Sequence, residues 1–478
     1  MEKKLGKTLG LLDATSLVAG SMIGSGIFIV SSNMARDVGA SGWLIVLWLI
    51  TGLITILAAL SYGELAGMMP NAGGQYVYIS RAYGRLTSFL YGWSVFTVIQ
   101  TGVIAAVAVA FSKYAAVFFP GLNKVLFNHA FGAVNYGHIL SIASLVFLTF
   151  INSRGVQNGR IVQLIFTSTK IFALFAIIVL GLVIGLQTDT LTNNFTDMWS
   201  AYKTTVGENN EISQIPLEGF VLMGALGATI INSLFSSDAW NNVTFIAGEI
   251  RDPKRNLPRS LIYGTLIVTG IYILVNLAYL ALLPISGDIN ATGTFEKGIM
   301  FAENNRVGAS AASVIFGNAG AYIMAGLIMI STFGCNNGLI LSGSRLFYAM
   351  SKDKLFFQTA KEINKYDVPG KALWIQCFWA SILCLSGTYE DLLVYATFVS
   401  LLFYILTIGG LFILRVKEPN MERPYKVFGY PILPALYILI TGAICIDLLI
   451  YDTTNTGIGL ILVGLGLPVY FIIRKNEK

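Results

Sequence analysis

The sequence predicts an all-α integral membrane protein of about twelve transmembrane helices, because it is apolar, sparsely charged and built from repeated apolar runs. Of its 478 residues, 55% are hydrophobic and 12% are charged, and the mean hydropathy is +0.70. Soluble domains carry about 25% charged residues. An apolar run of about 18 residues can cross a bilayer as a helix. We place the spans at 11–33, 43–68, 86–119, 137–152, 161–186, 219–247, 260–283, 311–343, 372–387, 391–414, 431–450 and 456–473.

The chain is predicted to form a single transmembrane domain over residues 1–478, since its longest hydrophilic connection, 187–218, is too short for a soluble domain. The net charge is +6, and the distribution of Lys and Arg between the loops indicates how the chain is oriented in the membrane. With both termini inside, the inner loops hold 24 Lys and Arg residues, and the outer loops hold only Arg36, Lys124, Lys203, Lys297 and Arg306. The positive-inside rule therefore predicts a multi-pass protein of the cell membrane with both termini in the cytoplasm.

Two of the spans are interrupted by polar or flexible residues. Span one contains Gly24-Ser25-Gly26, and span six contains a polar run from Ser236 to Asn242. Matching interruptions five spans apart are typical of transporters with inverted repeats and a binding site at the bilayer midplane. We therefore expect repeats of five spans each, at 1–186 and 215–414, with the last two spans at 431–473 as additions.

The backbone at the first interruption can bind both an anion and a cation. The amides near Ser25, Gly26 and Ile27 lie at the positive end of a half-helix, where an anion is favoured. The carbonyls near Met22 and Ile23 end the preceding half-helix and are expected to face a cation. A zwitterionic amino acid supplies both charges.

Two ionisable side chains lie inside the apolar spans. Lys170 is about ten residues from Arg160, or about 15 Å along a helix, and a lysine at the helix centre costs about 2.5–3.5 kcal/mol on insertion scales. Asp238 lies in the second interruption, near the expected substrate amine, where it could also transfer a proton. We find no catalytic motif, metal-ligand spacing or nucleic-acid footprint, so we expect no enzyme activity, no cofactor, no metal and no nucleic-acid partner.

Each feature also has a simpler structural interpretation. Small residues four apart pack membrane helices closely, long basic side chains can reach the interface, and an acidic residue can cap a half-helix. Gly20 and Gly24 could therefore serve only for close helix packing, Lys170 could extend to the interface, and Asp238 could cap a half-helix. Phe235 and Trp240 could be ordinary packing aromatics.

Four segments together resemble the amino acid–polyamine–organocation superfamily, and most closely its L-type amino acid transporter branch. They are the run 24–28 (GSGIF), Phe235 with Trp240-Asn241, the run 251–259 (RDPKRNLPR) and the run 331–338 (STFGCNNG). The resemblance extends from about residue 8 to about residue 415. From its prolines and mixed charges, we expect 248–259 to be a structured loop rather than a helix.

The resemblance implies a LeuT-like fold with five-plus-five inverted repeats and alternating access between broken helices one and six. It implies that backbone groups around Gly24, Ser25 and Gly26 hold the substrate carboxylate, and that carbonyls of Met22, Phe235 and Asp238, beside Ser236, hold the amine. Phe235, with Trp240, is implied as the gate. Lys170 is similar to a lysine that replaces a sodium ion, with Ser331 or Thr332 as its partner, which implies sodium-independent transport.

Two departures from the family pattern bear on partners and substrate. Members that pair with a glycoprotein have a cysteine between spans three and four, whereas 120–136 has none. We therefore expect a prokaryotic transporter with no covalent heavy-chain subunit. The run Ser236-Ser237-Asp238 is more polar than the matching run of members specific for large neutral amino acids. Cationic amino acids therefore remain an alternative substrate class.

The leading hypothesis is an exchanger of small or broad-range neutral L-amino acids in the lipid bilayer. A proton-coupled uptake permease and a cationic amino-acid exchanger remain alternatives. An ion channel would be a different class, for which a repeated pore motif or a ring of charges is expected.

Overall fold

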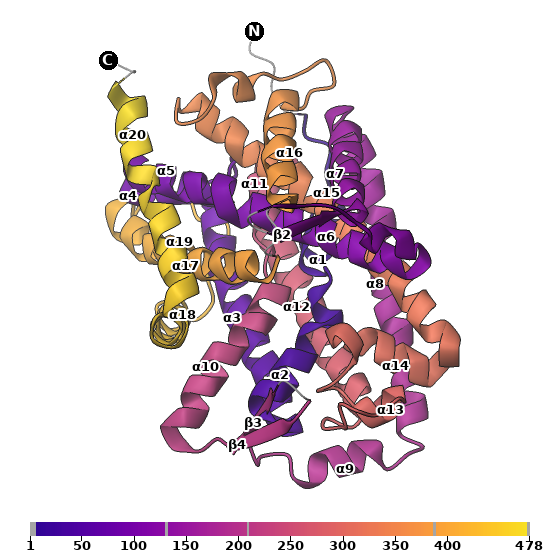
Figure 1. Cartoon of the computed structure of the whole chain (residues 1–478). Coiled ribbons are helices and arrows are strands. Elements are labelled where there is room, and N and C mark those ends of the chain that lie inside the picture. The colour runs from indigo at the N-terminus through magenta and orange to yellow at the C-terminus, as the bar shows by residue number, and fades with distance from the viewer. Residues whose placement is uncertain (1–5, 130–131, 208–209, 386–388, 476–478) are drawn as a thin grey trace.

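The computed structural model describes residues 6–129, 132–207, 210–385 and 389–475, and these parts are mainly helical (Figure 1). In them, ten helices are long and apolar enough to cross a membrane. The broken first span and the shorter helix α16 bring the crossings to the twelve that the sequence predicts. The unbroken crossings are α3 (Ser41–Met68), α5 (Arg85–Ser94) continuing through η2 (Val95–Ile99) into α6 (Gln100–Phe118), α7 (Tyr136–Ser153), α8 (Val156–Gly185), α12 (Pro253–Leu282), α15 (Gly320–Lys352), α16 (Gly370–Cys384), α17 (Tyr389–Lys417), α18 (Ile432–Tyr451), and α19 (Thr453–Gly464) with α20 (Gly466–Lys475).

Both predicted interruptions are present. Span one is divided into α1 (Leu11–Met22), a short 3-10 turn η1 (Gly26–Phe28) and α2 (Val30–Val38). Span six consists of α10 (Gly219–Ser236), then non-helical chain, then α11 (Asn242–Phe245) and η4 (Ala247–Glu249). Figure 1 shows α1 and α12 at the centre of the bundle, with α17–α20 along one flank.

Two boundaries differ from the sequence prediction. The predicted loop 248–259 is much shorter, since η4 extends to Glu249 and α12 already begins at Pro253. Proline is well suited to the first helical position, where its missing N–H would have no partner. The predicted span 311–343 is divided, because Gly317 has a φ of +60° and separates the short α14 (Val307–Phe316) from the crossing helix α15.

The connections expected on the outer side contain structure that hydropathy did not predict. The described residues of 187–207 and 210–218 include α9 (Thr190–Thr196) and an antiparallel hairpin of β3 (Tyr202–Val206) with β4 (Ile212–Pro216). A second hairpin pairs β1 (Val125–His129) with β2 (Gly132–Asn135). A small helix, α13 (Thr294–Lys297), lies between α12 and α14, and α4 (Gln75–Tyr83) precedes α5 at the opposite end.

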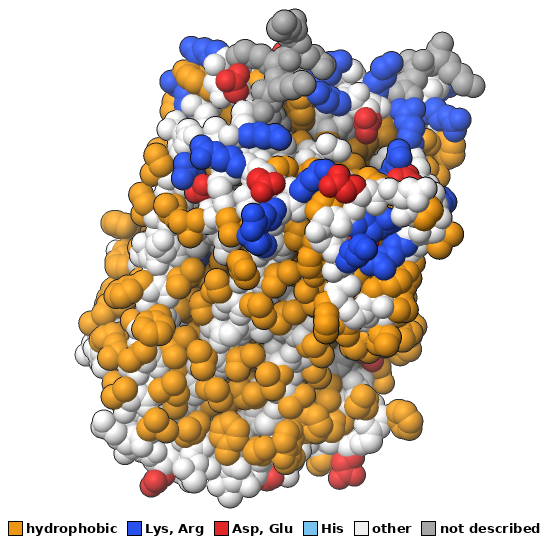
Figure 2. Space-filling view, turned by 180° about the vertical axis from the view of Figure 1, so that it is seen from behind, with side chains coloured by type: hydrophobic (Ala, Val, Ile, Leu, Met, Phe, Trp, Pro, Cys, Tyr) orange, Lys and Arg blue, Asp and Glu red, His pale blue; other side chains and the backbone are white. Residues whose placement is uncertain are grey.

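Charged side chains gather at the end of the molecule where both termini lie. Figure 2 shows Lys and Arg side chains over this end and a broad hydrophobic belt beneath them. Such a belt fits the hydrocarbon core of a bilayer.

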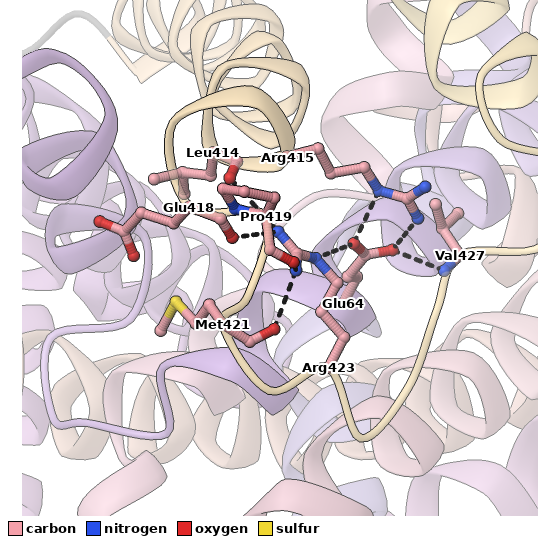
Figure 3. Close-up of polar contacts among 8 residues, drawn as sticks. All are labelled: Glu64, Leu414, Arg415, Glu418, Pro419, Met421, Arg423 and Val427. Atoms are coloured by element: carbon pink, nitrogen blue, oxygen red, sulfur yellow. Dashed lines mark hydrogen bonds and ion pairs between the residues drawn. The ribbon is translucent and has the colours of Figure 1, made fainter.

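A buried carboxylate joins three segments at this same end (Figure 3). Glu64 of α3 has no exposed side-chain surface, and its Oε2 lies 2.6 Å from Arg415 Nη2 and accepts the Val427 N–H at 2.8 Å. Its Oε1 lies 3.3 Å from Arg423 Nε. Glu64 lies near the end of α3, and its ion pairs and the Val427 hydrogen bond fix the α17–α18 connection to α3.

Candidate substrate site

The first interruption lies directly against the second. Ile23 leaves the helical conformation with ψ of 91°, and the chain re-forms a turn only at Gly26. Glycine and serine are weak helix formers, which explains why the helix ends here. A Cβ added to Gly26 would lie 2.2 Å from Ser236 Oγ, so only glycine allows this approach. The backbone of span one therefore contacts the last turn of α10.

The amides at this turn point to an anion site. Phe28 N–H donates to Ser25 O at 3.1 Å, which is the first hydrogen bond of the turn. The preceding amides, of Ser25, Gly26 and Ile27, are at the N-terminal end, where helical amides have no partner within the helix. An anionic group such as a carboxylate suits such amides.

The second interruption contains a strained residue. Ala239 has a φ of +66°, a conformation that residues with a Cβ rarely adopt. It follows Asp238, whose N–H donates to Phe235 O at 3.2 Å, and precedes Asn242, whose N–H donates to Ala239 O. Strained backbone is concentrated at functional sites, so this kink supports a functional role for the interruption.

Tyr272 of α12 connects the two interruptions. Its hydroxyl lies 3.1 Å from Met22 O and 3.0 Å from Ser236 O, which are the carbonyls at the ends of α1 and α10. The side chain is buried, and its ring packs edge to face on Trp48 at 5.4 Å. Sequence analysis missed this residue, because a tyrosine in an apolar span has no distinguishing pattern.

Lys170 lies at the first interruption, not at the membrane interface. Its side chain is 1% exposed, and Nζ donates to Gly20 O at 2.7 Å, to Ile23 O at 2.6 Å and to Ser331 O at 3.1 Å. Three carbonyl acceptors satisfy all three ammonium protons. The Ile23 carbonyl, which was predicted to face the substrate ammonium, accepts a hydrogen bond from Lys170 in the structure.

Ser331 and Thr332 of α15 differ in what they contact. Ser331 Oγ lies 3.1 Å from Ile23 O and 3.0 Å from Gly24 O, beside the Lys170 contacts. Among the described residues, Thr332 Oγ1 hydrogen-bonds within its own helix, to Ile328 O at 2.8 Å and Met329 O at 3.1 Å. Of the two partners expected for Lys170, the structure brings Ser331 to the interruption.

A buried amide network holds the helices around Lys170. Asn337 Nδ2 of α15 donates to Gly159 O at 2.9 Å and to Gln163 Oε1 at 3.0 Å, and Asn152 Nδ2 of α7 donates to Asn337 Oδ1 at 2.9 Å. A Cβ on Gly20 would lie 2.0 Å from Gln163 Nε2. The predicted close packing at Gly20 therefore exists, together with the polar contacts of the interruption.

Asp238 faces α17. Its Oδ1 accepts the Tyr404 hydroxyl at 2.5 Å, and that hydroxyl is also 3.3 Å from Asn241 Oδ1. Asn241 Nδ2 donates in turn to Gln75 Oε1 at 2.8 Å. Two cavities of about 20 Å³ each lie beside Asp238, and each is large enough for a water molecule. The carboxylate therefore belongs to a polar network between span six and span ten.

The two expected gate residues have different surroundings. Phe235 lies in the last turn of α10 and is partly buried. Trp240 is 3% exposed and packs between α3 and α17, with ring centroids 4.7 Å from Tyr62 and 5.3 Å from Tyr404. In this structure Trp240 is part of a packed aromatic cluster.

A family model described as "Amino acid permease" matches residues 9–470, nearly the whole chain. The chain belongs to the amino acid permease family. It is a multi-pass membrane transporter and not an enzyme, as the sequence predicted, and its mainly helical, twelve-crossing architecture with two broken spans agrees with the predicted LeuT-like fold.

Curated relatives are similar to this permease over its full length. The serine/threonine exchanger SteT of Bacillus subtilis (strain 168) is 30% identical, covering 99% of this chain and 98% of its own. The large neutral amino acids transporter small subunit 2 of Homo sapiens is 29% identical over 98% of this chain and 80% of its own. The human b(0,+)-type amino acid transporter 1 is 29% identical over 98% and 88%, respectively.

Proposed function

We propose that this permease is a sodium-independent exchanger of small or broad-range neutral L-amino acids that works by alternating access. The contacts of Lys170 carry the proposal. A fixed ammonium already occupies the carbonyls of Gly20, Ile23 and Ser331, where a cation could otherwise bind between α1 and α15. A sodium ion would have to displace this side chain to reach the same carbonyls, which supports sodium-independent transport. The similarity to a serine/threonine exchanger supports exchange of small neutral substrates.

The substrate would bind across the two interruptions. We assign its carboxylate to the amides of Ser25, Gly26 and Ile27, with Gly24 providing the turn. Its amine would lie near the carbonyls of Met22, Phe235 and Asp238, beside Ser236; the Ile23 carbonyl serves Lys170. We assign Phe235 as the gate, with Trp240 as the aromatic support behind the second interruption.

We also propose the cell membrane as the location, with both termini in the cytoplasm. The gathering of Lys and Arg at the end that holds the termini supports this orientation (Figures 1 and 2).

We propose that the permease acts without a covalent heavy chain. The segment 120–136 has no cysteine, and the four cysteines of the chain (Cys335, Cys377, Cys384 and Cys445) are all buried. A buried thiol cannot form a disulfide with another subunit without rearrangement of the helices around it.

The second candidate function is exchange of cationic amino acids or proton-coupled uptake of amino acids. The position of Asp238 favours it. This carboxylate lies in the span-six interruption and beside two cavities of water size. The similarity to the human b(0,+)-type transporter does not distinguish the neutral exchanger from this second candidate. A transport assay has to distinguish them.

Counterflow into proteoliposomes tests the proposal. Vesicles preloaded with unlabelled serine should accumulate labelled serine, threonine and alanine equally well in sodium and in choline buffer. Labelled arginine should accumulate poorly. Uptake that requires sodium, or that proceeds without an internal amino acid, would contradict the exchanger proposal, and accumulation of arginine alone would support the cationic alternative.

A further inference from the structure

A large cavity lies outside the substrate site, at the end of the molecule that is rich in Lys and Arg. Its volume is about 640 Å³, within the range of about 300–1,000 Å³ that is usual for ligand pockets. It is bounded by α5, by the end of α15 with the connection that follows, and by α20. In Figure 1, α20 runs along the flank of the bundle beside α5. The cavities beside Asp238 are far smaller.

The walls of this cavity are aromatic and fixed by ring packing. Phe96 packs on Phe356 at 5.0 Å between ring centroids, and Phe356 packs on Phe357 at 5.0 Å. Phe89 stacks on Trp93 at 6.4 Å. The indole N–H of Trp93 donates to Leu462 O at 3.0 Å, so its one polar atom is already satisfied. The interior therefore presents hydrocarbon surface suited to an alkyl chain.

The cavity lies beside the last turns of α20, whose apolar surface ends at Arg474 and Lys475, as expected for a helix end where a membrane meets water. On α20, the neighbouring side chains Phe471 and Ile472 are 57% and 62% exposed, as expected for a surface that faces lipid. Phe357 lines the cavity and is 59% exposed. Aromatic residues are enriched at this level of a bilayer. A lipid could therefore enter from the side without passing through the protein.

The mouth of the cavity is basic. Lys354 lines it and is exposed, and no ion pair of Lys354 occurs among the described residues. Arg474 and Lys475 directly follow Ile473, which also lines the cavity. The lining contains no acidic residue. Basic pockets between membrane helices are typical sites for anionic lipid head groups.

We propose that this cavity binds an anionic phospholipid of the adjoining leaflet, with one acyl chain between α5 and α20 and the phosphate beside Lys354. An apolar interior with a basic mouth matches both parts of such a lipid. A zwitterionic lipid would gain less from Lys354, because the cation of its head group offsets the phosphate charge, and a small soluble anion would leave the aromatic interior unused. Tyr91 of α5 lines a small cavity beside Asp238, and Ser331 of α15 contacts the first interruption, so the bound lipid would lie against two helices that also reach the candidate substrate site.

Trp93 provides a direct probe of this site, because bromine atoms on an acyl chain quench tryptophan fluorescence at short range. The full-length permease in detergent is titrated with dibrominated phosphatidylglycerol and, separately, with dibrominated phosphatidylcholine. The Trp93 signal is isolated by subtracting the same titration of Trp93→Phe. We expect saturable quenching by the glycerol lipid at several-fold lower concentration than by the choline lipid.

Two variants test the two parts of the site. Lys354→Gln should raise the phosphatidylglycerol concentration for half quenching by about fivefold, since one Lys near an anionic lipid is worth about that factor. Lys365→Gln, an exposed lysine of the same connection that lies over Tyr366, is the matched control and should not shift it. Val469→Phe should abolish the saturable phase by filling the cavity. Equal quenching by both lipids, or no shift with Lys354→Gln, would overturn the proposal and leave only non-specific lipid contact.

Discussion

Arg345 and Glu249 form an ion pair that is closed to solvent. Arg345 Nε lies 2.6 Å from Glu249 Oε1, and the exposed fractions of the two side chains are 0% and 1%. Arg345 also donates to Leu341 O at 2.9 Å and to Ser344 Oγ at 3.0 Å. The pair fixes the end of the second broken span, η4, to α15, which also contributes Ser331 to the first interruption.

Removal of one member of this pair should be strongly destabilising. Glu249→Gln leaves the Arg345 charge buried without its counter-charge, which typically costs about 3–5 kcal/mol. We expect a large fall in the unfolding temperature of the detergent-solubilised permease, measured by size-exclusion chromatography after heating. The double variant Glu249→Leu with Arg345→Leu should recover part of the loss, because no unpaired charge remains.

The exposed pair of Lys371 with Glu362 is the matched control, since it has the same N–O distance of 2.6 Å but exposed fractions of 55% and 53%. Lys371→Met should cost about 0–1 kcal/mol. Equal shifts for the buried and the exposed variants would show that burial does not determine the effect.

Lys170→Ala should reduce exchange by more than tenfold while the protein still reaches the membrane. The variant removes a cation from three carbonyls, at Gly20, Ile23 and Ser331, and leaves them buried without a donor. Serine counterflow per molecule of reconstituted permease is the measurement. Lys113→Ala is the control, because Lys113 also lies in an apolar crossing but is exposed. Near-normal exchange by Lys170→Ala would contradict the role assigned to Lys170.

Gly26→Ala should abolish substrate binding through a clash with α10. Its Cβ would lie 2.2 Å from Ser236 Oγ and 2.8 Å from Ser236 Cβ. Adding Ser236→Gly to this variant removes both atoms, so the double variant should regain part of the exchange. Gly270→Ala, at a position where no atom lies within 4 Å, is the control and should behave as wild type. If the single variant binds serine normally in a thermal-shift titration, the close approach at Gly26 is not required.

Tyr272→Phe should weaken the connection between the two interruptions. It removes the hydroxyl that lies near Met22 O and Ser236 O, and the loss of one hydrogen bond of this kind costs about 1 kcal/mol. We expect a several-fold fall in the exchange rate with a small change in thermal stability. Tyr263→Phe, an exposed tyrosine of the same helix, is the control. A rate unchanged by Tyr272→Phe would mean that packing alone holds the interruptions together.

Hydropathy and the glycine-rich interruptions allowed the fold to be predicted, because a membrane crossing leaves a long apolar signature. The same signal could not separate α14 from α15, since both are apolar and only the positive φ of Gly317 divides them. It also missed the hairpin of Tyr202–Val206 with Ile212–Pro216, because short strands carry no length signal. Long, apolar elements are therefore predictable, and short polar connections are not.

At the site, Lys170 could be found from sequence because a buried charge is costly and therefore conspicuous. Tyr272 could not be found from sequence. A tyrosine hydroxyl in a membrane span carries only a small free-energy cost, and its partners here are backbone carbonyls of distant segments. The direction of the Asp238 side chain was also unpredictable, because it depends on how span six bends at Ala239. The residue types at the site were thus visible in the sequence, but their partners were not.

The hydrogen bond between Asp238 and Tyr404 makes a specific prediction for Asp238→Asn. The carboxylate accepts the Tyr404 hydroxyl at 2.5 Å, and an asparagine oxygen can accept the same bond with less strength because it is uncharged. If this bond is the main role of Asp238, then Asp238→Asn and Tyr404→Phe should slow exchange by similar factors. The double variant should be no slower than either single variant, since both remove one interaction.

Two other roles for Asp238 are contact with the substrate amine and proton transfer. Transport of labelled alanine and arginine at two pH values, by wild type and by these variants, distinguishes them from the hydrogen bond to Tyr404. A carboxylate that faces the substrate amine would make Asp238→Asn weaken arginine transport more than alanine transport, and Tyr404→Phe would not reproduce that difference. A carboxylate that carries a proton would make the variant lose the pH dependence of uptake while exchange persists. Because the carboxylate is directed at Tyr404 and span ten, we expect alanine and arginine to be affected equally at both pH values, and any selective loss would contradict the structural role.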